Sequence, residues 1–296
     1  MSLTISAVIP VYSRFQYLKE TLDSVFAQTR RLDEVIVVDD CSPEPVHEFL
    51  AGIGLAGAVR VLRTDRNRWP SGARNWGWRQ SRGDLIAFLD SDDLWEPDKT
   101  RIQAEFLAAN PGVDGVYGTM TAFWPDGRTE PWAEARAPMV ESQHGLIDQN
   151  IYLQTLMIRR AALERIGGFD ERYKILEDTD ATIRMGQSGL KIAFFPDPPA
   201  TRYRFHENNM SNESWRRLKE QSKIGYRHRM LCSQCYGSGS ARVFLGRAIA
   251  RFGWHTRHMG LPSRVLAKLL YVSAPFSRMP RLTTSSEGEL DPLRSS

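Results

Sequence analysis

One short run, Phe88 to Asp93, limits what this chain can fold into more than any other part of its sequence. Three apolar residues, Ala87 to Leu89, lead directly into Asp90, Asp92 and Asp93. Such an apolar run is typical of a buried strand, and in open α/β sheets ligands gather at the carboxyl ends of strands. Hard divalent cations prefer carboxylate oxygens, so the Asp90 and Asp92 pair predicts a metal site. The alternative is a solvated turn that caps the following helix.

Strands and helices alternate up to this run. Apolar segments predict four strands, at Ile5–Val11, Val35–Val38, Val59–Leu62 and Asp84–Leu89. The helix after the first strand starts with a Ser13 and Gln16 capping box. Its apolar stripe consists of Leu18, Leu22, Val25 and Phe26. This order predicts an α/β fold with a parallel sheet, in which the acids that follow two strands meet at one edge.

Six short motifs follow one another along the chain. They are Val8-Ile9-Pro10-Val11-Tyr12, Val37-Val38-Asp39-Asp40-Cys41-Ser42, Ala73-Arg74-Asn75, Leu89-Asp90-Ser91-Asp92-Asp93, Gly167-Gly168-Phe169-Asp170-Glu171 and Glu177-Asp178-Thr179-Asp180. In order and spacing they resemble the motifs of family 2 glycosyltransferases. The resemblance extends from about Leu3 to Ser211. It implies a GT-A fold with a Rossmann-like nucleotide-binding half and a mixed central sheet, and here a C-terminal helical extension follows.

The resemblance also implies an activity. Members of the family transfer a sugar with inversion from a nucleotide-diphosphate sugar, usually a UDP-sugar, with the help of Mn2+ or Mg2+. The acceptor is a hydroxyl group of a glycan, a lipid-linked sugar or another molecule. The chain has no run of 18 apolar residues and lacks the Gln-x-x-Arg-Trp motif of the membrane-embedded synthases. We therefore expect a non-processive enzyme that adds one sugar or a few.

Donor contacts follow from the resemblance, residue by residue. Pro10 and Tyr12 are expected to line the nucleoside pocket, and Asp39 to accept a hydrogen bond from the base. Arg74 is expected to pair with the diphosphate through its planar guanidinium group. Asp90 is expected to face the ribose.

Metal ligation and catalysis are assigned in the same way. Asp92 is expected to ligate the metal, and His206 lies where the family often has a histidine near the metal and diphosphate. Inversion requires a base opposite the leaving group, and we expect Asp178 to be that base, with Glu177 as its rival. Repulsion among the acids of this segment predicts that one of them has a raised pKa. The alternative to a catalytic role is that these acids, at the N-terminus of a helix, only complement the helix dipole.

The sequence predicts three parts. Residues 1–211 form the GT-A domain, with nucleotide-sugar binding in 1–118 and the acceptor site and base in 119–211. A basic helical extension follows at 212–280, and a disordered tail at 281–296. Gly167 and Gly168 are expected to form a tight turn.

Charge differs between the two ends of the chain. Residues 1–200 carry 22 basic and 29 acidic side chains, and residues 201–296 carry 17 and 6. Two basic amphipathic helices are expected within 241–280, and these either contact an anionic membrane surface or pack on the catalytic domain. We expect no nucleic acid as a partner, because the chain has no nucleic-acid-binding motif and the catalytic half is acidic.

Three cysteines and the lack of an N-terminal signal sequence favour the cytoplasm, with peripheral attachment to the inner face of the membrane through the basic helices. A second interpretation is a catalytically silent module that binds a nucleotide-sugar or a glycan. A nucleotide-dependent oxidoreductase is excluded, because Pro10 to Arg14 stands where a Gly-x-Gly-x-x-Gly turn would have to follow the first strand. The sequence leaves the identities of the sugar and the acceptor open.

Overall fold

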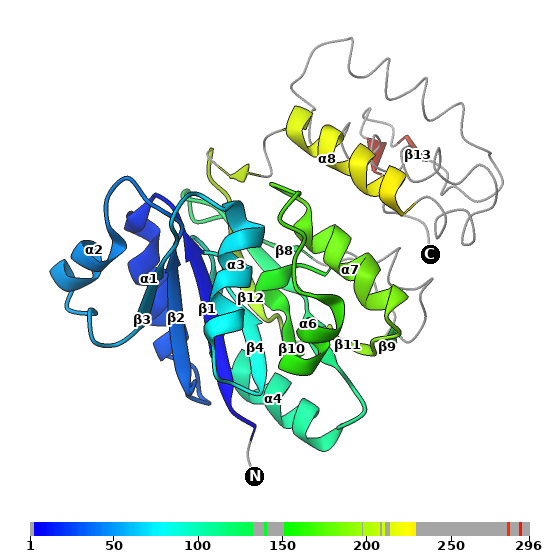
Figure 1. Ribbon diagram of the computed structural model, residues 1–296, viewed down its shortest axis with the longest axis horizontal. Coiled ribbons are helices and arrows are strands. Elements are labelled where there is room, and N and C mark those ends of the chain that lie inside the picture. The colour runs from blue at the N-terminus through cyan, green and yellow to red at the C-terminus, as the bar shows by residue number, and fades with distance from the viewer. Residues whose placement is uncertain are drawn as a thin grey trace. The chain divides into compact units, whose positions relative to one another are not determined.

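Figure 1 shows a computed structural model of the chain. The structure describes residues 3–132, 139–140, 151–196, 198–207, 209–210, 214–228, 283–284 and 290–291. The chain divides into two compact units, Met1–His206 and Glu207–Ser296. The domain boundary at residue 211 stays a prediction.

The first unit contains the four predicted strands and the helices between them. Its first half consists of β1 (Ile5–Val11), α1 (Phe15–Phe26), β2 (Glu34–Asp39), α2 (Val46–Gly52), β3 (Arg60–Arg63), α3 (Trp69–Gln80), β4 (Leu85–Phe88), β5 (Leu94–Trp95) and α4 (Lys99–Ala109). Its second half consists of β6 (Gly115–Gly118), β7 (Met120–Phe123), β8 (Thr129–Trp132), β9 (Met139–Val140), the short 3-10 helix η1 (Leu153–Thr155), β10 (Met157–Arg159), α6 (Arg160–Ile166), α7 (Glu177–Gln187), β11 (Ile192–Phe195) and β12 (Thr201–Arg204).

The main sheet is mixed, as expected. Its strand order is β3-β2-β1-β4-β10-β6-β11-β9, and the first four strands are parallel. Strand β10 is antiparallel to both of its neighbours, β4 and β6. Val11 pairs with Asp39 and Val8 pairs with Phe88, so the acid-bearing ends of β2 and β4 lie on either side of the end of β1.

A second, smaller sheet has the order β5-β12-β7-β8. Strand β5 follows the acidic turn after β4 and runs antiparallel to β12, with Trp95 opposite Thr201. Because β12 leads toward His206, this pairing brings His206 back to the acidic turn.

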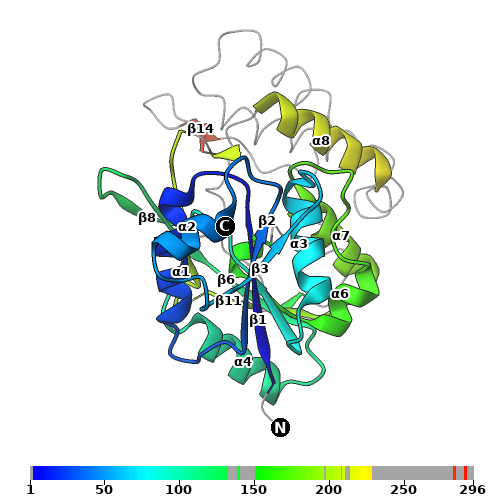
Figure 2. The same ribbon diagram turned by 60° about the vertical axis from the view of Figure 1, so that its left-hand side comes forward.

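Both faces of the main sheet are covered by helices. Alternate residues of β1 point into two separate apolar clusters: Val8 packs with α3, α6 and α7, whereas Ala7 and Ile9 pack with α1, α2 and α4. Figure 2 shows α3, α6 and α7 on one side of the sheet and α1 and α2 on the other. Two buried faces explain why these strands are continuously apolar instead of alternating.

Local details correct two predictions. The capping box is wrong, because α1 begins one residue later than it requires: Arg14 is the N-cap, in a left-handed conformation, and no side chain caps the helix. Phe26 is 40% exposed and does not continue the buried stripe of Leu18, Leu22 and Val25.

In the second unit the structure describes α8 (Ser214–Arg227) and a pair of two-residue strands, β13 (Thr283–Thr284) and β14 (Leu290–Asp291). The basic helices predicted within 241–280 lie outside the described residues, as does most of the predicted tail at 281–296. No helix in the described part of the chain is long and apolar enough to cross a membrane.

Candidate active site

Arg74 joins two of the predicted site residues. Its guanidinium group donates to a carboxylate oxygen of Asp90, in the turn after β4, and to one of Glu177, at the start of α7. Arg74 is buried, and its Nε atom has no hydrogen-bond partner among the described residues. Breaking such a buried pair would leave an uncompensated charge, so Arg74 fixes the turn after β4 relative to α7.

Asp92 and His206 lie side by side. The Oδ2 atom of Asp92 is 3.0 Å from Nε2 of His206, although the two residues are 114 positions apart in sequence. The His206 ring stacks on Tyr17 with a centroid distance of 5.3 Å. A carboxylate oxygen and an imidazole nitrogen suit a divalent metal such as Mn2+. The described residues contain no group of three or more potential ligands, so a metal here needs further oxygen atoms from elsewhere.

Asp93 is fully buried and has a different environment from Asp92. Its Oδ1 atom accepts a hydrogen bond from the Arg204 N–H group at 2.9 Å, and its Oδ2 atom has no partner among the described residues. Burial raises the pKa of Asp93 well above its usual range, and the charges of Asp92 and Asp90 add to the rise. Asp93 therefore connects the turn to β12.

Arg204, the last residue of β12, contacts the residues around Asp92 and His206. Its Nε atom donates to the Asp92 carbonyl oxygen at 2.8 Å, and Nη2 donates to Glu20 at 2.8 Å. Its guanidinium group lies 4.6 Å from the centroid of the Tyr17 ring. Arg204 thus holds the backbone that carries Asp92, and it also sits against the ring that supports His206.

The end of β2 contributes two buried acids. Asp39 accepts hydrogen bonds from the Ser42 N–H group at 2.8 Å and from Arg63 Nη1 at 2.5 Å. Asp40 accepts from the Thr64 hydroxyl at 3.0 Å and from the Arg68 N–H group at 2.8 Å, and burial raises its pKa. These bonds order the loop after β2.

Two predicted nucleoside contacts lie at the end of β1. Pro10 is partly buried within the strand, and Tyr12, the first residue after the strand, is 45% exposed. An exposed aromatic ring beside the carboxyl edge of a sheet can stack on a nucleobase. The contact itself stays a prediction.

Three acids in the first turn of α7 have three different environments. Asp180 is fully buried and pairs with Arg184 at 2.7 Å. Glu177 is buried against Arg74, and burial raises its pKa to about 7; Asp178 adds to the rise, whereas Arg74 opposes it. Asp178 is partly exposed and accepts a hydrogen bond from the Thr179 N–H group at 2.7 Å. One pKa is raised as predicted, but burial is a larger cause than the expected repulsion.

Asn75 belongs to one of the six motifs, but the sequence predicts no role for it. Its amide nitrogen donates to the Phe169 carbonyl oxygen at 2.8 Å, and its Oδ1 atom accepts from the Phe169 N–H group at 2.9 Å. Gly167 and Gly168 form the expected tight turn, with φ values of 72° and 75°. A Cβ atom on Gly168 would lie 2.5 Å from Asn75 Oδ1, so the glycine allows this close approach.

Backbone strain occurs around the same edge of the sheet. In the described part of the chain, the non-glycine residues with positive φ are Arg14, Cys41, Trp69 and Leu176. They lie after β1, after β2, at the start of α3 and just before α7. Each costs on the order of 1–3 kcal/mol, and such residues cluster at functional sites. Their residue types give no sequence signal for this conformation.

The structure is an α/β domain with a mixed sheet, in which acids gather at the carboxyl ends of parallel strands. Residues 6–167 match the family described as glycosyl transferase family 2. The match covers more than half of the chain, and the chain belongs to this family of glycosyltransferases.

Similar proteins agree with this assignment. The chain is 27% identical over 209 residues to an uncharacterized glycosyltransferase of Haemophilus influenzae, and the match covers 70% of each chain. It is 32% identical over 187 residues to the succinoglycan biosynthesis protein ExoO of Rhizobium meliloti, covering 59% of this chain and 53% of that one. It is 27% identical over 216 residues to the amylovoran biosynthesis glycosyltransferase AmsB of Erwinia amylovora, covering 67% and 69%.

Solved structures share the fold. S. aureus TarS in complex with UDP-GlcNAc superposes with a TM-score of 0.69 at 20% identity, covering 91% of this chain and 79% of that one. The mannosyltransferase PcManGT of Pyrobaculum calidifontis, in complex with GDP-Man and Mn2+, gives 0.61 at 18% identity, with coverages of 91% and 79%. At these identities the likeness establishes the GT-A fold.

Proposed function

We propose that this chain transfers a sugar from a nucleotide-diphosphate sugar, a UDP-sugar, to a hydroxyl acceptor with inversion at the anomeric carbon. The observation that carries the proposal is the pairing of Asp92 with His206 beside the Arg74 network. That arrangement combines a place for a cation with a cationic side chain, which is what a diphosphate leaving group requires.

Donor binding is assigned to the edge formed by β1, β2 and β4. Tyr12 and Pro10 would line the nucleoside pocket, Asp39 would accept a hydrogen bond from the base, and Asp90 would face the ribose. Arg74 would bind the diphosphate. Because its guanidinium group is buried and pairs with Asp90 and Glu177, it would have to exchange one of these contacts for the ligand.

Asp92 and His206 would hold Mn2+ or Mg2+. When bound, the metal neutralises negative charge on the departing diphosphate. The chain's own contribution is the position of the two ligands: Arg204 fixes the Asp92 backbone, and Tyr17 supports the His206 ring. The diphosphate oxygens would supply the further ligands that these two residues lack.

We assign the base to Asp178. The acceptor oxygen bonds to the anomeric carbon, the bond from that carbon to the diphosphate oxygen breaks, and the hydroxyl proton passes to Asp178. Glu177 is buried and pairs with Arg74, so it would have to leave that ion pair to reach an acceptor. Asp178 is partly exposed, which favours it as the base. Glu177 instead positions the first turn of α7.

We assign a growing glycan, in free or lipid-linked form, as the acceptor. Relatives named for succinoglycan and amylovoran biosynthesis support polysaccharide assembly at the cell envelope. A lipid-linked acceptor would suit an enzyme on the cytoplasmic face of the membrane, held there by the basic segment at 241–280. The transfer would be non-processive.

Product analysis tests this proposal against a silent binding module. The protein is incubated with Mn2+, individual sugar nucleotides and a lipid-linked glycan extract, and nucleoside diphosphate release is followed. Proton NMR of the product then reports the anomeric configuration. Release of one diphosphate together with an inverted linkage supports the proposal. Binding of a sugar nucleotide with no release under any condition favours the silent module, and a retained linkage contradicts direct displacement.

A further inference from the structure

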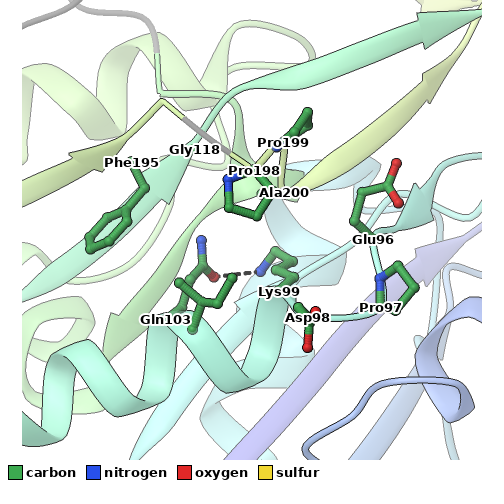
Figure 3. A pocket seen from close by; sticks show the side chains of 11 residues that line it. Glu96, Pro97, Asp98, Lys99, Gln103, Gly118, Phe195, Pro198, Pro199 and Ala200 are labelled. Carbon is green, nitrogen blue, oxygen red and sulfur yellow. Dashed lines mark hydrogen bonds between the residues drawn. The ribbon is translucent and has the colours of Figure 1, made fainter.

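The first unit has a pocket that lies apart from the residues assigned above. Its volume is about 350 Å3, and it opens between the start of α4 and the segment that leads from β11 to β12. Figure 3 shows Pro198 and Ala200 facing Lys99 and Gln103 across it. The apolar part of the wall consists of Pro97, Ile102, Phe195, Pro198 and Pro199. Small-molecule sites are commonly apolar cavities of this size with a few convergent polar groups.

Lys99 is the cation of this pocket. It is 2% exposed, its Nζ atom donates to Gln103 Oε1 at 2.8 Å, and it lies 4.5 Å from the centroid of the Trp95 ring. No carboxylate of the described residues lies within ion-pair distance of it. An ammonium group has three hydrogens to donate, and one neutral acceptor leaves this buried charge without a counter-ion. Burial lowers the pKa of Lys99 to about 7.

Two acids line the pocket, and neither neutralises Lys99. Asp98 accepts hydrogen bonds from the Thr29 hydroxyl at 2.7 Å and from Arg101 Nε at 3.0 Å, so its carboxylate already has partners. The Glu96 carboxylate lies well apart from the Lys99 amino group in Figure 3. The amino group is therefore the charged feature of the inner wall, and the acids lie to one side.

We propose that this pocket binds a small organic carboxylate, with its carboxylate on Lys99 and its apolar body against the prolines and Phe195. A monoanion matches one cation, whereas a phosphate dianion would bring a second charge into an apolar cavity next to two acids. The apolar wall also favours a ligand with a hydrocarbon or aromatic body over a small inorganic ion.

The position of the pocket separates it from the donor site. Trp95, under the Lys99 amino group, is on β5, and Ala200 directly precedes β12. These two strands pair, and their other ends lie toward Asp92 and His206. A carboxylate on Lys99 would therefore occupy the opposite end of the strand pair from the proposed metal ligands.

Calorimetric titration of the full chain with benzoate, at about pH 6.5 where Lys99 is largely charged, tests the proposal. We expect saturable binding that Lys99→Met weakens by at least about tenfold. Lys19→Met is the matched control, because Lys19 is exposed on α1 and should leave the affinity unchanged. Glu96→Gln removes a negative charge from the pocket wall and should not weaken binding. Inorganic phosphate should bind more weakly than benzoate.

A second measurement keeps the test decisive if Lys99→Met does not fold. In wild-type protein labelled with 13C at the lysine ε carbons, the resonance that titrates near pH 7 belongs to Lys99, and benzoate should raise its pKa because an anion stabilises the charged amine. The proposal is overturned if wild-type protein does not bind benzoate. Equal binding by Lys99→Met, stronger binding of phosphate than of benzoate, or a Lys99 resonance unaffected by benzoate would each overturn it too.

Discussion

The turn after β4 and the first turn of α7 each carry three acids in four positions, and the structure uses them in different ways. In the turn after β4, Asp92 contacts His206 and Asp93 is buried against the Arg204 backbone. In α7, Asp180 pairs with Arg184 within the helix, and Asp178 stays partly exposed. Arg74 joins the two turns through Asp90 and Glu177.

The two turns contain the same number of acids, but the role of each acid depends on the residue that it contacts. An acid with a buried cationic partner contributes to structure, because removing either member leaves a charge without compensation. Asp178 is partly exposed, and Asp92 faces an imidazole that can itself bind a metal. We therefore assign Asp92 to metal binding and Asp178 to catalysis, whereas Asp90 combines its contact with Arg74 and its proposed place at the ribose.

The largest expected effect is on kcat, and it distinguishes Asp178 from its neighbour Glu177 in α7. Asp178→Asn should lower kcat about 10^3-fold, because it removes the base, and should leave UDP affinity within about twofold. Glu177→Gln should lower kcat only about tenfold, because its carboxylate acts through position. Steady-state kinetics with saturating donor and a UDP titration of each variant provide the comparison. A greater loss of kcat in Glu177→Gln than in Asp178→Asn would exchange the two roles.

The next effect concerns stability. Asp180→Asn should lower the free energy of unfolding by about 3 kcal/mol, because it removes the fully buried member of an ion pair and leaves the charge of the mostly buried Arg184 uncompensated. Urea unfolding measures the change. Asp23→Asn is the matched control, since its pair with Lys19 is exposed and should contribute less than about 1 kcal/mol. Similar losses in the two variants would mean that Asp180 is not the structural acid of α7.

A smaller effect is expected in the turn after β4. Asp92→Ala should weaken Mn2+-dependent UDP binding by about 10- to 100-fold, because one of two protein ligands is lost. Calorimetry with and without Mn2+ measures it, and Asp126→Ala, at the exposed tip before β8, is the control. If Asp92→Ala bound UDP as wild-type protein does, Asp92 would belong with the structural acids.

The last expected effect is on the pH dependence of stability. Because the pKa of Glu177 is raised from 4.5 to about 7, the folded state holds this proton more tightly than the unfolded state. Its stabilising contribution is therefore complete below about pH 4.5 and is lost as the pH rises through 7, with a slope of at most about 1.4 kcal/mol per pH unit. Glu177→Gln cannot titrate, so urea unfolding between pH 5 and pH 8 should give a flatter curve. Parallel curves would mean that the pKa of Glu177 is not raised.

Much of the fold could be predicted from the sequence, because apolar runs and the acids after them are local signals. The strand at Ile5–Val11 was predicted with its observed bounds, and the two glycines of the tight turn were recognised from residue type. Asp92 and His206 were named through the family resemblance, and their proximity is now observed while their roles remain proposals.

Other parts of the site could not be predicted because their partners are distant in sequence. Asn75 bonds to a residue 94 positions away, and the Arg204 backbone bonds to Asp93, 111 positions away. Neither pairing has a periodic or compositional signal. The left-handed backbone at Cys41 and Trp69 could not be predicted either, since neither residue type favours this conformation.

Calorimetric titration of the wild-type chain with UDP, GDP, dTDP and CDP, with and without Mn2+, tests whether the chain has a metal-dependent donor site. We expect that UDP binds, that its affinity depends on Mn2+, and that the other three nucleotides bind more weakly. Failure of all four to bind with Mn2+ present, or UDP binding of the same strength with and without the metal, would contradict a metal-assisted donor site at Asp92 and His206.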